Sequence, residues 1–76
     1  MLRKWKYCSP AGTLYIIELE AGTFCFKYKG ELGDTCDDPE VLADNVFLHS
    51  SGCDKWDSLP PSPYDPSDLS EWEPLF

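Results

Sequence analysis

Four cysteines and one histidine are the residues of this chain whose types could bind a metal ion. They are Cys8, Cys25, Cys36 and Cys53, with His49 as a spare ligand. Four cysteine thiolates can close a tetrahedral zinc site. The intervals between them are 17, 11 and 17 residues, so the sequence lacks the Cys-x-x-Cys knuckle that marks such a site. A small zinc-binding domain is therefore an alternative interpretation, and a chain without a cofactor is the first expectation.

His49 is also the residue that could serve a catalytic serine or cysteine, because Ser50, Ser51 and Cys53 follow it closely. Residues that adjoin at the end of a helix seldom align as nucleophile and base, and no nearby residue is expected to orient the imidazole. A histidine in the last helical turn usually complements the helix dipole or lies at the edge of the core. The sequence also has no glycine-rich phosphate loop and no calcium-loop spacing. We therefore expect that the protein is not an enzyme.

Acidic residues are the second group that could carry function. The formal net charge is −8, and residues 31–76 hold twelve Asp or Glu against Lys55 alone. Such a surface favours a protein partner with a basic surface and disfavours nucleic acid. The expected contact residues lie at the start of the helix and after it: Asp37, Asp38, Glu40, Asp44, Asp54 and Asp57.

The charge pattern predicts a small acidic non-enzymatic protein-interaction module. In a sharper form it is an inhibitor or a mimic of DNA charge, since phosphate-binding sites attract any suitably spaced anions. A purely structural role is a further alternative.

The elements that must position these residues are strands first and then a helix. Alternating or β-rich segments predict strands over residues 2–8, 13–20 and 23–29, with a short further segment after Gly30. Asp37 or Asp38 can cap a helix in which Pro39 takes the first position, and Gly52 is expected to end it. The predicted fold class is α+β: a small antiparallel meander of two to four strands with one helix packed on one face.

The C-terminal tail, residues 60–76, is rich in Pro and holds Trp72, and we expect it to be extended. We expect a single domain in which residues 1–59 form a β-β-β-α globular part and the tail packs back on it. Trp56 and Trp72 are the predicted anchors, because large aromatic side chains bury much area. Asp65 before Pro66 predicts one helical turn through Trp72.

The expected location is the cytoplasm. No run of 18 apolar residues is present, and the basic start of the chain has no apolar segment after it, as a signal peptide would.

One resemblance spans residues 12–72. It rests on short matches, which include Gly12-Thr13-Leu14-Tyr15-Ile16, Leu32-Gly33, Pro39-Glu40, Ala43-Asp44, Val46, His49, Ser51-Gly52, Trp56-Asp57 and Asp68-Leu69-Ser70-Glu71-Trp72. The series resembles a set of short bacterial proteins called hypothetical. The resemblance implies a bacterial or phage source, and it carries no activity, cofactor or catalytic residue.

Overall fold

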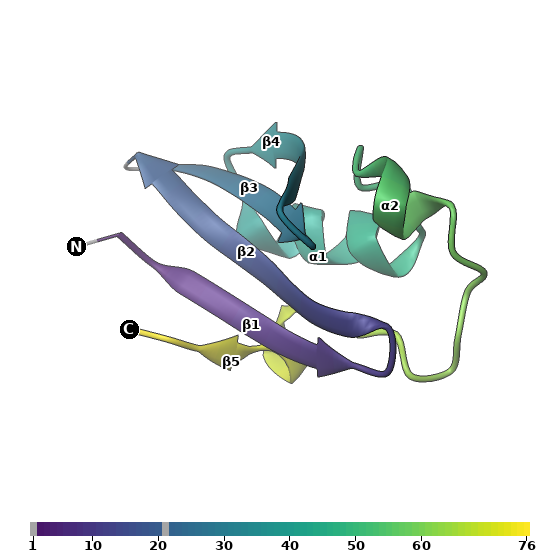
Figure 1. The fold of residues 1–76 in the computed structure, drawn as a ribbon. Helices are drawn as coiled ribbons and strands as arrows, with labels where there is room; N and C mark the ends of the chain where they lie inside the picture. Colours follow the sequence, from purple (N-terminus) through teal and green to yellow (C-terminus); the bar gives the residue numbers. More distant parts are fainter. Residues whose placement is uncertain (1, 21) are drawn as a thin grey trace.

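An antiparallel sheet of five strands forms one layer of the protein. The computed structural model describes residues 2–20 and 22–76. The strands are β1 (Lys4–Ser9), β2 (Gly12–Glu20), β3 (Thr23–Tyr28), β4 (Glu31–Cys36) and β5 (Glu73–Pro74). Their order in the sheet is β4-β3-β2-β1-β5, so the first four strands follow the chain as a meander and the last one is added from the C-terminus (Figure 1).

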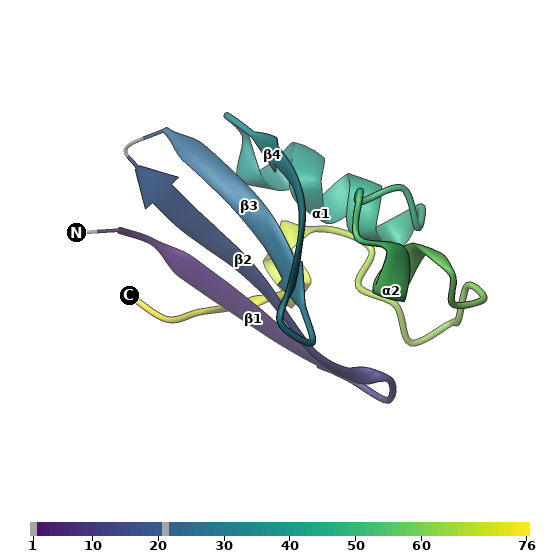
Figure 2. The same cartoon turned by 45° about the horizontal axis from the view of Figure 1, so that its top comes forward.

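Helical segments form the second layer. They are α1 (Pro39–Phe47), α2 (Asp54–Asp57) and the 3₁₀ helix η1 (Leu69–Glu71). Figures 1 and 2 show α1 and α2 on the same side of the sheet. The predicted α+β class, an antiparallel sheet with a helix packed on one face, is therefore confirmed. None of the described helices is long and apolar enough to cross a membrane.

The core lies between the sheet and α1. Aromatic side chains alternate along β3, so one face of that strand meets the helix. The buried set from β2, β3 and α1 is Leu14, Ile16, Phe24, Phe26, Tyr28, Leu42, Ala43 and Val46. Gly33 of β4 lies against the loop after α1, where an added Cβ would come within 2.5 Å of the Ser51 carbonyl oxygen. Only a residue without a side chain allows this approach, and it brings the loop onto the sheet.

Glu18 is the charged residue of this buried face. Its carboxylate accepts hydrogen bonds from the backbone N–H of Arg3 at 2.8 Å and of Gly22 at 3.1 Å. These hydrogen bonds, the one from Arg3 above all, lower the pKa of the Glu18 carboxyl. The carboxylate thus fastens the start of the chain and the turn after β2 to the same strand end.

The start of α1 agrees with the prediction, whereas its end does not. Asp38 is the cap, and its carboxylate accepts the Glu40 backbone N–H at 2.9 Å. The helix ends at Phe47, and His49 takes the left-handed conformation with φ of 54°. The expectation that Gly52 would end the helix is therefore wrong, because His49 already turns the chain and its side chain is held there by hydrogen bonds.

The C-terminal part of the chain also holds more structure than predicted. β5 pairs with β1, with Trp5 opposite Pro74, so the sheet exceeds the expected two to four strands. The four-residue helix α2 was not expected. The helical turn before Trp72 is shorter than predicted, and Asp68 rather than Asp65 caps it. The connection between the strands predicted over residues 13–20 and 23–29 includes Ala21, which lies outside the described residues.

Candidate functional site

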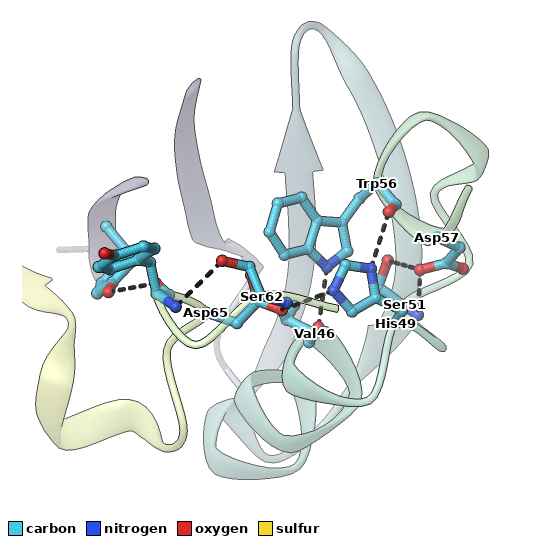
Figure 3. A network of polar contacts seen from close by, with 9 residues as sticks. Val46, His49, Ser51, Trp56, Asp57, Ser62 and Asp65 are labelled. Atoms are coloured by element: carbon cyan, nitrogen blue, oxygen red, sulfur yellow. Dashed lines mark hydrogen bonds and ion pairs between the residues drawn. The ribbon is translucent and has the colours of Figure 1, made fainter. Parts of the chain in front are cut away.

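The His49 junction consists of His49, Ser51, Trp56, Asp57 and Asp65, and it joins the end of α1 to α2 and the tail (Figure 3). The Nδ1 atom of His49 lies 3.0 Å from the Trp56 carbonyl oxygen. Its Nε2 atom lies 2.8 Å from Oδ2 of Asp65. The expectation that nothing orients the imidazole is therefore wrong, because Asp65, 16 residues away, reaches it through the fold.

Both ring nitrogens of His49 face hydrogen-bond acceptors. The two side chains are each only 6% exposed, so the contact between them is buried. Together the two contacts fix the orientation of the imidazole ring.

The Ser51 side chain contacts Asp57 and makes no hydrogen bond with His49. The Ser51 hydroxyl donates to Oδ1 of Asp57 at 2.8 Å, and the same carboxylate accepts the backbone N–H of Ser51 and of Gly52. Asp57 thereby closes the loop between α1 and α2. The hydroxyl has no imidazole beside it as a base, so the arrangement does not provide a serine nucleophile.

Trp56 forms the centre of the junction. It is 1% exposed, and its indole N–H donates to the Val46 carbonyl at 2.8 Å. Its ring stacks on the His49 imidazole at 4.6 Å, and it meets the edge of Tyr28 at 5.4 Å. The hydrogen bond and the stacking together fix α2 against the end of α1.

The four cysteines do not come together. Cys8 is exposed on β1, Cys25 and Cys53 are buried, Cys36 is half-buried, and all four are free thiols. Within residues 2–20 and 22–76, no group of three or more His, Cys, Asp or Glu is placed to hold a metal. Burial raises the pKa of the Cys25 and Cys53 thiols, whereas zinc needs thiolates. The four cysteines predicted as ligands in the zinc alternative therefore lie apart in the structure and form no common site.

The acidic groove is the second candidate site, and it runs between α1 and η1. Its volume is about 300 Å³, and it is lined by Glu40, Asp44, Asp68, Leu69 and Ser70. A neighbouring hollow of about 340 Å³ shares Glu40, Leu69 and Ser70 with it and continues over Trp5, Trp72 and Pro74. The two hollows are thus adjacent, with carboxylates along the first and the Trp5 and Trp72 side chains along the second.

No family model, no curated protein and no solved structure matches this chain. The geometry of its own side chains is therefore the basis for a functional interpretation.

The structure separates the six carboxylates predicted to bind a partner. Glu40 and Asp44 line the acidic groove, and Asp54 is exposed in α2. The other three make local contacts: Asp37 with the Cys36 thiol, Asp38 at the start of α1, and Asp57 with the Ser51 loop.

Two carboxylates of the candidate sites, Asp65 and Asp68, were not among the predicted site residues. Asp68 lies three residues before Glu71, the spacing of a capping box, and this pattern could have located it. Asp65 gave no such signal for its contact with His49, since the contact spans 16 residues.

Proposed function

We propose that this protein is a small non-enzymatic interaction module that binds a basic segment of a protein partner in the acidic groove. The observation that carries this proposal is the convergence of three carboxylates on one groove: Glu40 and Asp44 from α1, and Asp68, which caps η1. Carboxylates from two separate elements can contact one Lys or Arg side chain from several directions.

The carboxylates of the groove lack cations of their own. Within the described residues the ion pairs are Arg3–Glu18, Lys6–Glu73 and His49–Asp65, so Glu40 and Asp44 take part in none. They stand four residues apart on α1, where like charges destabilise a helix by roughly 0.2–0.5 kcal/mol. A cation from a partner would remove this repulsion, which supports a basic occupant.

Trp72 adds a hydrogen-bond donor beside the carboxylates. It is 3% exposed, and its indole N–H has no acceptor among the described residues. A buried donor without a partner costs roughly 1–3 kcal/mol. Because Trp72 lines the hollow next to the groove, a backbone carbonyl of a bound segment would supply the acceptor after a small movement of the ring.

The outer face of α1 adds apolar contact area. Val41 is 43% exposed, Phe47 44% and Leu48 65%. They share this face with Glu40 and Asp44, since residues three and four apart on a helix are neighbours. A segment in which Lys or Arg alternates with apolar residues therefore matches the surface in both charge and polarity.

The test is a capture experiment with three forms of the tagged protein: the natural chain, a Glu40→Lys and Asp44→Lys double variant, and Asp54→Lys as a control for charge alone. Asp54 is exposed and lies outside the groove. From a bacterial lysate, we expect the natural chain and the control to retain the same protein, and the double variant to lose it. Raising the salt concentration to about 0.5 M should release that protein, because exposed charges are screened.

Equal capture by the double variant, or capture that is indifferent to salt, would contradict a basic partner in the groove. The charge-mimic form makes one additional prediction: the captured protein should also bind nucleic acid. Duplex DNA added to the resin should then release the captured protein, because the DNA phosphates compete with the carboxylates for the same basic site.

A further inference from the structure

A small apolar pocket lies beside the His49 junction, away from the acidic groove. Its volume is about 160 Å³. Its apolar walls come from three parts of the chain: the turn between β1 and β2, helix α2, and the residues that lead into the tail. These walls are Pro10, Ala11, Trp56, Leu59 and Pro60. The polar residues at its border are Ser9, His49, Ser62 and Asp65.

Most polar atoms around the pocket already have partners. The Ser9 hydroxyl donates to the Gly12 carbonyl at 2.6 Å, and both nitrogens of His49 are engaged. Oδ2 of Asp65 accepts from His49 and from the Ser62 backbone N–H at 2.9 Å. The other carboxylate oxygen, Oδ1, accepts no hydrogen bond from the described residues. Among the side chains that line the pocket, Asp65 therefore offers a carboxylate oxygen that has no hydrogen-bond partner among the described residues.

We propose that this pocket binds a single apolar ring that carries one O–H or N–H donor, with Asp65 Oδ1 as the acceptor. The volume sets the size of the ring, since an apolar cavity of about 150 Å³ accommodates benzene. The free acceptor selects the donor, because a polar group left unpaired in an apolar site weakens binding. An anionic ring is excluded, because the carboxyl group and the net charge of −8 repel it.

This chemistry has two sources, a free small molecule such as a phenol, or the side chain of a tyrosine presented by another protein. The probes that separate them are phenol and N-acetyltyrosinamide, whose ring is attached to a peptide-like backbone. Toluene is the matched control for the donor, because a methyl group replaces the hydroxyl. Benzoate is the control for charge.

The measurement is a titration of the ¹⁵N-labelled chain followed by NMR. We expect phenol to shift the Trp56 indole N–H and the amides of Ser9 and Ala11, with nuclear Overhauser effects from the phenol ring to Trp56 and Leu59. Toluene should bind about tenfold more weakly, since a hydrogen bond to a charged group is lost. Benzoate should not bind. Shifts with N-acetyltyrosinamide would identify a presented side chain as the source, and their absence would identify a free molecule.

Ala11→Leu tests the location, because Ala11 is exposed in the turn and its new side chain would fill the pocket. Thr35→Leu is the control, with the same new side chain on the exposed side of β4. Phenol should lose its effect on the first variant and keep it on the second. Three results would each overturn the proposal: no phenol contact with Trp56 in the natural chain, equal binding of toluene, or unchanged binding by Ala11→Leu.

Discussion

Trp56 and Trp72 are both buried, yet their surroundings are opposite. The indole N–H of Trp56 donates to the Val46 carbonyl, and its ring stacks on His49. The indole N–H of Trp72 has no acceptor among the described residues, and its ring contacts Tyr7 with 5.9 Å between the ring centres. The first tryptophan belongs to the His49 junction, whereas the second lies beside the acidic groove.

The carboxylates follow the same division. Asp57 and Asp65 accept hydrogen bonds from the loop and the imidazole inside the His49 junction. Glu40 and Asp44 form no ion pair with a described residue. An acidic residue in the sequence is therefore no guide to function by itself. Its partners decide whether it holds the fold together or remains free for a ligand, and this difference can be measured as stability.

Trp56→Ala should give the largest loss of stability. Removing a buried tryptophan costs about 3–5 kcal/mol, and here the hydrogen bond from the indole N–H to the Val46 carbonyl is also lost. Trp72→Ala should cost ~3 kcal/mol, at the lower end of this range. Trp72 is also buried, at 3% exposed, but its removal breaks no hydrogen bond of the indole N–H. Urea unfolding followed by circular dichroism measures both values. An unchanged midpoint for Trp72→Ala would instead show that this ring serves a partner and not the core.

Asp65→Ala comes next in size. It would leave the His49 imidazole without its carboxylate in a buried place, and breaking such a pair costs roughly 3 kcal/mol. The matched control is Asp54→Ala, which removes an exposed carboxylate and should change the free energy of unfolding by less than about 0.5 kcal/mol. Equal losses of stability in the two variants would mean that Asp65 contributes no more to the free energy of unfolding than an exposed carboxylate does.

The conservative pair Trp56→Phe and Trp72→Phe isolates the indole N–H. Each variant loses a similar amount of ring, but only the first breaks a hydrogen bond, the one to the Val46 carbonyl, which keeps the His49 backbone N–H at 3.1 Å. Trp56→Phe should therefore cost about 1 kcal/mol more than Trp72→Phe in the same unfolding experiment. If Trp72→Phe is the more costly of the two, its N–H has an acceptor, and the contrast between the two tryptophans fails.

The sheet and α1 could be predicted because their signals are local. The alternation of Phe24, Phe26 and Tyr28 marks one strand face, and Asp38 before Pro39 marks the start of the helix. β5 could not be predicted, since two residues with a proline form no local strand pattern. Its pairing depends on Trp5, almost 70 residues earlier in the chain, and no short window of sequence contains both partners.

The candidate sites were predictable only in part for the same reason. Glu40 and Asp44 belong to the acidic start of a helix that the sequence shows clearly. Asp68 joins them through the packing of η1 on α1. The left-handed conformation of His49 was unexpected, because residues other than glycine rarely adopt it. Its contacts with Trp56 and Asp65 come from the folding of the tail, which local propensities do not describe.

Asp44→Asn should have the smallest effect on stability, and one of opposite sign to that of Asp65→Ala. Removing the charge relieves the repulsion with Glu40 four residues earlier, so the protein should become more stable by roughly 0.2–0.5 kcal/mol. Asn and Asp have similar helix propensities, so the change isolates the charge. The same variant should bind the captured partner more weakly, because the groove loses one carboxylate. A residue that lowers stability while it strengthens binding serves the interaction with the partner and not the fold. A loss of stability on Asp44→Asn would instead place this carboxylate with Asp57 and Asp65, among those that hold the fold.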